Sequence, residues 1–365
     1  MNHARSGALG RRLLVAGSIT ATAALAFTGC ASSGGSGQGA SGDETISVSL
    51  ITKTDTNPFF VAMQQGAEDI ADELGVELTL AAGSEDGDED SQIQAIENAI
   101  SRGDAGILIT PNGPAVEDAL VKARDAGLYV IALDTPPSDP ESVDITFATD
   151  NYLAGQEIGT WAAAKLDGEK ATIAMIDLFD DKVVSVDVAR DQGFLDGMGI
   201  DLADETKNGD EESTGTYSGG DYEIVGNEAS QGAEDGGRTA AETLLSQNPD
   251  INVVYTINEP AAYGAYEAFK AAGSTDGLIV VSVDGGCAGV DAVTEGIIGA
   301  TSQQYPLKMA ELGVKAVYDL VTTGETPEVS EGLDFYNTGV ALVTDDPQDG
   351  VESIDTAEAT EICWG

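Results

Sequence analysis

Residues 46–60 read ISVSLITKTDTNPFF and give the clearest indication of fold in this chain. Every second residue from Ile46 to Leu50 is apolar, which predicts a strand. A polar loop follows. Asn57-Pro58 then predicts a helix start, because Asn is a favoured N-cap and Pro is favoured at the first helical position. Open α/β sheets bind ligands in loops of this kind, at the carboxyl ends of strands.

The same alternation of strand and helix continues along the chain and restarts at residue 171. Short, nearly continuous apolar runs predict strands that are buried on both faces, as in a parallel sheet. The predicted strands after the first are 76–81, 107–110, 129–133, 171–178, 251–257 and 278–283. The sequence therefore predicts an α/β fold with two doubly wound parallel-sheet lobes, each of ordinary domain size.

The first 44 residues predict export and anchoring. Residues 1–29 combine basic residues with an apolar run that is too short to span a membrane comfortably, which is typical of a signal peptide. Cys30 follows small residues and resembles the lipidated first residue of a bacterial lipoprotein; an ordinary secretory signal is the alternative. Residues 30–44 are mostly Gly and Ser and predict a flexible tether. We expect an extracytoplasmic protein held on the outer face of the cell membrane.

The charge is extreme, with 64 acidic and 16 basic residues and a formal net charge of −48. A nucleic-acid partner is excluded, since phosphate binding needs a basic surface. Contact with the membrane is expected only through the lipid. The acidic residues concentrate in segments such as 84–90 and 201–235, which we interpret as solvated loops. Calcium binding at 86–90 is not favoured, because DGDED lacks the complete EF-hand pattern.

The only histidine is His3, inside the predicted signal. Serine and cysteine nucleophile systems that need histidine are therefore excluded, as are histidine metal ligands. We predict no enzymatic activity, no metal and no cofactor. A carboxylate pair of the glycosidase kind stays open, but chance pairs are expected in so acidic a chain. Cys287 and Cys363 are predicted to form a disulfide in an exported protein, with two buried free thiols as the alternative.

Polar residues follow several predicted strands, namely Thr110, Asp134, Asn258 and Asp284. Since these come from both lobes, they predict a cleft lined with acceptors and amides. The loop before residue 60 adds hydroxyls, an amide and two phenyl rings. Such a set suits a sugar, which needs hydrogen bonds at its edge and apolar contact on its faces.

At this level of detail the chain resembles sugar-binding periplasmic proteins of the ribose-binding type, which serve ABC importers. The resemblance covers residues 45–365 and implies the type I periplasmic binding fold, with two lobes joined by a hinge. The residue patterns of LITKTDTNPFF, YTINEPAA and SVDGGC are most similar to those of fructose-binding proteins. The matching motifs are TNPFF (56–60), ILITP (107–111), VIALDTP (130–136), TFATDN (146–151), ARDQGF (189–194), VVYTINEPAAYGAYEAF (253–269), VVSVDGG (280–286) and GATSQQYP (299–306).

The resemblance implies a set of ligand-binding residues. The aromatic pair would contact the sugar ring, the aspartates and the arginine would bind its hydroxyls, and the others would complete the shell. These residues are Asn57, Phe59, Phe60, Thr110, Asp134, Thr149, Arg190, Asn258, Asp284 and Gln304. Thr135 stands where the ribose-binding pattern has Arg, and Gln231-Gly232 falls where an aromatic is expected. These departures leave room for a larger or different sugar.

Each role has a plainer alternative. Arg190 could form a surface ion pair, the phenylalanines could be core residues, and the aspartates could cap helices.

The predicted lobes are 45–149 with 304–333, and 150–303 with 334–365. The chain would cross between them near 149–150, 303–304 and 331–334.

We therefore expect a monomeric lipoprotein that captures a monosaccharide, fructose by preference, and passes it to ABC permease subunits. The alternative is a sensory protein that presents its sugar to a receptor or kinase, which neighbouring permease and ATPase genes would distinguish. A repressor core is disfavoured, because the chain has a signal and an acidic surface instead of a DNA-binding helix pair.

Overall fold

The computed structural model describes residues 45–365. The predicted signal peptide, the predicted lipidation site Cys30 and the predicted tether lie outside these residues. Among the helices that are described, none is both long and apolar enough to cross a membrane.

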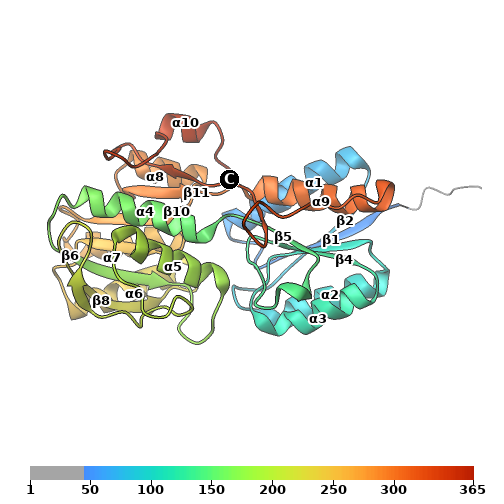
Figure 1. Cartoon of the computed structure of the whole chain (residues 1–365), viewed down its shortest axis with the longest axis horizontal. Coiled ribbons are helices and arrows are strands. Elements are labelled where there is room, and N and C mark those ends of the chain that lie inside the picture. Colours follow the sequence, from blue (N-terminus) through green and yellow to red (C-terminus); the bar gives the residue numbers. More distant parts are fainter. Residues whose placement is uncertain (1–44) are drawn as a thin grey trace, which may run out of the picture. The chain divides into compact units, whose positions relative to one another are not determined.

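The first sheet has the strand order β12-β5-β4-β3-β1-β2, and all its strand pairs are parallel. Helices α2 and α3 cover one face, and α1 and α9 cover the other (Figure 1). The strands are β1 (Ser47–Thr52), β2 (Glu77–Ala82), β3 (Gly106–Ile109), β4 (Tyr129–Leu133), β5 (Ile145–Ala148) and β12 (Tyr336–Asn337). The helices are α1 (Pro58–Leu74), α2 (Glu89–Arg102), α3 (Glu117–Asp125) and α9 (Pro306–Thr323).

The second sheet has the order β13-β11-β10-β9-β6-β8-β7, with antiparallel pairs only at its two edges. Helices α4 and α5 pack on one face, and α6 and α7 on the other (Figure 1). The strands are β6 (Ala171–Asp177), β7 (Thr214–Thr216), β8 (Asp221–Ala229), β9 (Val253–Thr256), β10 (Ile279–Asp284), β11 (Ala300–Gln303) and β13 (Ala341–Val343). The helices are α4 (Asn151–Lys165), α5 (Ser185–Met198), α6 (Glu234–Gln247), α7 (Glu259–Ala272), α8 (Cys287–Thr294) and α10 (Thr356–Thr360).

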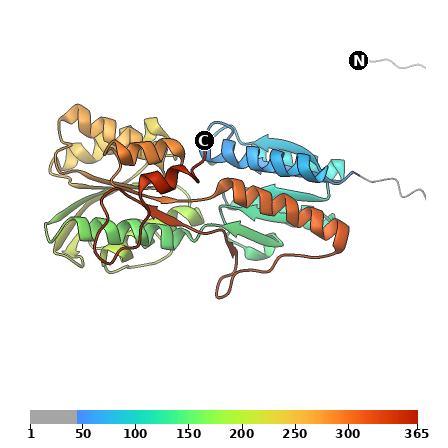
Figure 2. The same cartoon turned by 90° about the horizontal axis from the view of Figure 1, so that it is seen from above.

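Each sheet is the middle layer of a lobe with apolar cores above and below it, as the sequence predicted. The helix start at Asn57-Pro58 is also confirmed, because the Asn57 side chain accepts a hydrogen bond from the Phe59 backbone N–H at 3.0 Å. Helix α9 lies beside α1 although the two are far apart in sequence (Figure 2). The chain therefore returns to the first lobe after completing most of the second.

Two expectations from the sequence were wrong, one about the third crossing between the lobes and one about segment 201–235. Strand β12 pairs with β5, so residues 336–337 belong to the first sheet, and the third crossing follows residue 337 instead of lying near 331–334. A two-residue strand has too little apolar pattern to be recognised. Segment 201–235 is not simply a solvated loop, because strand β8 within it forms seven residue pairs with β6. Acidic residues and the half-buried position of β8 mask its alternation.

Candidate ligand-binding site

The loops at the carboxyl ends of both sheets enclose a cavity of about 40 Å³, which we call the inner cavity. Its walls combine charged, amide, aromatic and aliphatic side chains from the two lobes. They are Lys53, Asn57, Phe59, Phe60, Asp86, Asp134, Leu178, Val186, Arg190, Ile257, Asn258, Asp284 and Gln304. All the predicted ligand-binding residues are in this wall except Thr110 and Thr149. Those two are buried, and their hydroxyls have no hydrogen-bond partner among the described residues.

Asp134 lies between two cations, one from each lobe. Its Oδ2 is 3.8 Å from Lys53 Nζ, and its Oδ1 is 3.9 Å from Arg190 Nη2. Thr135 Oγ1 also donates to Asp134 Oδ2 at 2.7 Å. The two cations are slightly too far away for direct hydrogen bonds to the carboxylate, so both can donate to a ligand. Since all three charged side chains are almost fully buried, their attraction is stronger than it would be in water.

Arg190 on α5 is held rigidly and is not part of a surface ion pair. Its Nε donates to Asn151 Oδ1 at 2.8 Å, and its Nη1 donates to the Ile257 carbonyl at 2.9 Å. These bonds fix the plane of the guanidinium and leave Nη2 directed toward Asp134. A guanidinium fixed in this way is prepared for hydrogen bonding and loses little freedom when a ligand binds.

Asp284 at the end of β10 has a mixed role. Its Oδ2 accepts from the Glu259 backbone N–H at 3.3 Å, so it does help to cap α7, and its Oδ1 accepts from Gln304 Nε2 at 3.0 Å. Burial raises the pKa of Asp284, an effect that Arg190 opposes. Burial and the nearby Asp284 also raise the pKa of Glu259. Gln304 Oε1 is buried without a partner among the described residues and remains available as an acceptor.

Both cleft aspartates have unusual backbone conformations. Asp134 has φ of 64° and Asp284 has φ of 152°. Positive φ strains a residue that has a Cβ, and such strain is concentrated at ligand sites, where the surrounding structure imposes it. These two conformations favour a binding role for the aspartates over a purely structural one.

Two charged wall residues escaped the sequence analysis. Lys53 follows β1 directly, in the position where the other cleft residues follow their strands, and that position is the signal that could have identified it. Asp86 lies in segment 84–90, which was expected to be solvated, yet it lines the cavity. Burial raises the pKa of Asp86, and Lys53 opposes this effect. The expectation of a fully solvated acidic loop was therefore wrong at this residue.

Phe59 and Phe60 belong to the core of the first lobe and also line the cavity. Their rings meet edge to face with centroids 5.3 Å apart. Phe59 also packs edge to face on Trp364, at 5.4 Å, so the C-terminal tail supports the aromatic wall from behind. Both residues are therefore core residues, as the alternative held, and they also lie at the cavity where the predicted contact with a sugar ring would be made.

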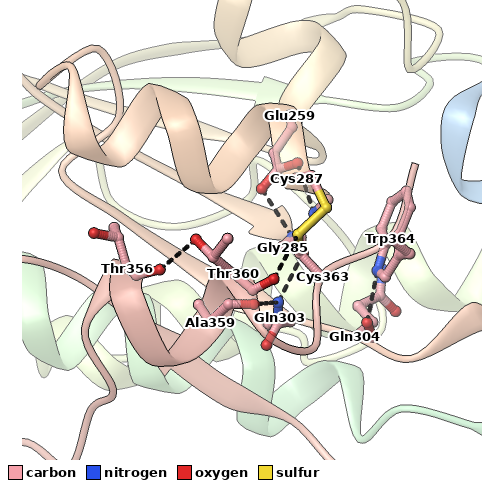
Figure 3. Close-up of a disulfide and its surroundings, with 11 residues drawn as sticks. Glu259, Gly285, Cys287, Gln303, Gln304, Thr356, Ala359, Thr360, Cys363 and Trp364 are labelled. Carbon is pink, nitrogen blue, oxygen red and sulfur yellow. Dashed lines mark hydrogen bonds between the residues drawn. A yellow bond between two sulfur atoms is a disulfide. The ribbon is translucent and has the colours of Figure 1, made fainter.

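The tail is fastened beside the second crossing between the lobes, as Figure 3 shows. Cys287 and Cys363 are joined as a disulfide, with Cα atoms 4.9 Å apart. The Trp364 indole N–H donates to the Gln304 carbonyl at 2.8 Å, and the Cys287 backbone N–H donates to the Trp364 carbonyl at 2.9 Å. The tail therefore connects helix α8, the crossing at residue 304 and the aromatic wall.

Within the described residues, no group of three or more His, Cys, Asp or Glu side chains is placed to hold a metal ion. The cavity instead offers fixed donors, carboxylate acceptors and apolar surfaces that come from two lobes. Such a site is suited to enclosing a small polar molecule.

Comparisons with known proteins agree with this architecture. Residues 48–326 match the periplasmic binding protein domain. The ribose import binding protein of Escherichia coli K12 is 28% identical over 289 residues, which cover 79% of this chain and 88% of that protein. The D-apiose import binding protein of Actinobacillus succinogenes is 30% identical over 289 residues, 78% of this chain and 85% of that protein. A solute-binding protein of an ABC transporter from Agrobacterium vitis, solved with D-fucose, aligns with a TM-score of 0.71 and 25% identity over 87% of this chain and 100% of that one.

The fold and the two-lobed cavity define a type I periplasmic binding protein. The resemblance to the ribose-binding type that was seen in the sequence is confirmed, whereas the finer resemblance to fructose-binding proteins is not shown. The chain belongs to the periplasmic binding protein family that includes the ribose-binding type. It is a binding protein and not an enzyme.

Proposed function

We propose that this protein captures a monosaccharide between its two lobes outside the cytoplasm and delivers it to the permease of an ABC importer. The observation that carries the proposal is Asp134, which is faced by Lys53 from one lobe and Arg190 from the other inside a buried cavity. The relatives named as ribose and D-apiose import binding proteins support the class of ligand and the transport role.

The chemistry of the wall fits a sugar. Each hydroxyl can donate to a carboxylate and accept from an ammonium or guanidinium group, and charge-assisted hydrogen bonds of this kind are strong. Phe59 and Phe60 provide apolar contact for the C–H faces of the ring. Leu178, Val186 and Ile257 offer similar contact from the second lobe.

The mechanism follows from the position of the cavity between lobes that are joined by three crossing segments. Two direct contacts close the cleft: Ser185 Oγ donates to the Pro136 carbonyl at 2.6 Å, and Lys182 Nζ donates to the Gly87 carbonyl at 3.2 Å. A sugar that binds groups of both lobes stabilises the closed form by its contacts with each. The permease then recognises that closed form.

The finer features are part of the same proposal. Among monosaccharides, D-fructose is the preferred ligand, because the quoted motifs are most similar to those of fructose-binding proteins. Lipid attachment at Cys30 holds a monomeric protein at the outer face of the membrane, and the tether of residues 30–44 lets it reach the permease.

Isothermal titration of the purified full chain with D-fructose, D-ribose, D-xylose, D-glucose, D-galactose and myo-inositol tests the proposal. One sugar is expected to bind one-to-one, and Asp284→Asn is expected to weaken it at least tenfold, because an amide replaces a buried carboxylate acceptor. Asp291→Asn, an exposed change on α8, is the matched control and leaves the affinity unchanged. Absence of heat with every sugar would contradict the monosaccharide proposal.

A further inference from the structure

A second and larger hollow adjoins the inner cavity. We call it the outer pocket. It has a volume of about 290 Å³, and its walls come from the loops that contain Thr56, Asp86 and Ala233 and from Pro260 at the start of α7. Asn57 and Asp86 line both spaces, so the two are neighbours with a common wall. The inner cavity alone is far below the roughly 300–1,000 Å³ of small-molecule sites, and the two together reach the lower end of that range.

Gly232 stands at the junction of the two spaces. It lines the outer pocket, while its neighbours Leu178 and Asn258 line the inner cavity. A Cβ at this position would lie 3.1 Å from Leu178 Cδ1, 3.1 Å from Asn258 Nδ2 and 3.4 Å from Asp86 Oδ2. A larger side chain at residue 232 would therefore occupy the junction, and the glycine leaves it free.

The backbone beside this junction is strained in the same way as that of the cleft aspartates. Gln231 has φ of 55°, a left-handed conformation that is unfavourable for a residue with a Cβ. Three bonds hold it there: Gln231 N–H to the Leu178 carbonyl at 2.9 Å, Gly232 N–H to Ser230 Oγ at 3.2 Å, and Asn258 Nδ2 to the Gly232 carbonyl at 3.0 Å. Of the non-glycine residues with positive φ in the described part of the chain, only Asp167 lies away from these two spaces.

The walls of the outer pocket have the chemistry of a carbohydrate site. The lining combines the hydroxyl and amide groups of Thr54, Thr56 and Asn57 with the apolar surfaces of Pro58 and Pro260. None of the lining residues is a lysine or arginine, whereas Glu85 and Asp86 are carboxylates. An anionic ligand group is therefore disfavoured, and a neutral group with several hydroxyls fits.

From these observations we propose that the outer pocket binds a second sugar unit, linked to the unit in the inner cavity, so that the preferred ligand is a disaccharide. This inference rests on the proposed function and deepens it. The linkage passes the junction that Gly232 leaves free, and Asn57 and Asp86 contact both units.

Titration of the purified full chain with matched sugars tests the inference. The pairs are D-fructose with sucrose and levanbiose, D-glucose with maltose, and D-galactose with melibiose. One disaccharide is expected to bind at least tenfold more tightly than either of its component sugars. Ala233→Trp places an indole in the outer pocket from an exposed residue with ordinary extended φ, and it should lower the ratio of disaccharide to monosaccharide affinity at least tenfold.

Two further variants make the test decisive. Thr56→Trp fills the pocket from the opposite lobe and should lower the same ratio, while Ala271→Trp, exposed on α7, should change neither affinity. The second subsite is overturned if no disaccharide binds at least tenfold more tightly than its component sugars. It is also overturned if neither pocket variant changes the ratio of disaccharide to monosaccharide affinity. If a monosaccharide still binds in that case, the proposed function survives, whereas no binding by any sugar overturns both.

Discussion

Lys53 is the residue whose burial is hardest to explain without a ligand role. Its ammonium group lies 3.8 Å from Asp134 Oδ2 and 6.0 Å from the centre of the Phe60 ring, and no hydrogen bond from it is found within the described residues. Burying a lysine is costly unless its charge is compensated. Asp134 provides that compensation, and the three N–H donors remain available for an oxygen of the ligand.

We therefore expect Lys53→Met to weaken sugar binding roughly tenfold to a hundredfold, as the loss of a hydrogen bond from a charged group does. Arg190 still faces Asp134 in this variant, so the protein should remain folded. Isothermal titration measures the affinity, and Lys122→Met, an exposed change on α3, is the control. An unchanged affinity would show that Lys53 only neutralises Asp134.

At the scale of elements, the C-terminal tail connects helix α8 to the second crossing between the lobes. The Cys287–Cys363 disulfide closes a sequence separation of 76 residues. In the chain-entropy picture, a loop of this size destabilises the unfolded state by roughly 4 kcal/mol. Trp364, the residue after Cys363, packs against Phe59, so the tail has a stabilising role and a positioning role.

The double substitution Cys287→Ser/Cys363→Ser separates these roles. The free energy of unfolding, measured by urea titration, should fall by roughly 2–4 kcal/mol. Sugar affinity should fall less than tenfold, because Trp364 still donates to the Gln304 carbonyl and packs on Phe59. Wild-type protein treated with a reductant should behave like the variant. Equal stability of the oxidised and substituted proteins would contradict the account.

Site residues and strands could be predicted from the sequence where their polarity differed clearly from that of the neighbouring residues. Asp134 and Asp284 could be predicted because each follows or ends a run of apolar residues, where a carboxylate stands out. Asp86 could not, since it lies among other acids and its half-buried place in the cavity wall depends on residues that are distant in the sequence. Strand β8 was missed for a related reason. Gly226 and a register shift opposite Ile173–Ala174 interrupt its alternation, and pairing with β6 sets its position.

At the scale of the whole molecule, ionisation of carboxyl groups disfavours the folded state both at the surface and in the interior. A formal charge of −48 produces self-repulsion that grows as carboxyl groups ionise. Several carboxyl groups are buried as well. Burial and the nearby Glu352 raise the pKa of Glu157 to about 7, and burial also raises the pKa of Asp187 and Glu259. In the folded protein these groups hold their protons more tightly than in the unfolded chain.

Their raised pKa values predict that stability decreases as the pH rises from about 5 to 8. Between the ordinary carboxyl pKa and the raised folded-state values, the folded protein binds more protons, so increasing pH favours unfolding. Glu157 alone contributes at most roughly 3 kcal/mol, at about 1.4 kcal/mol per pKa unit. Exposed carboxyl groups with lowered pKa values, such as Asp204 at about 2, have no effect in this window because they stay ionised throughout it.

The melting temperature of the unliganded protein should therefore be higher at pH 5 than at pH 8, with the full chain at one fixed concentration. Adding 1 M NaCl should raise it most at pH 8, because salt screens the surface repulsion and affects the buried carboxyl groups much less. Glu157→Gln should reduce the pH dependence that remains in high salt, since the amide cannot ionise, while the exposed change Glu68→Gln should not. A melting temperature that rises from pH 5 to pH 8 would mean that these buried carboxyl groups are stabilised in their ionised form.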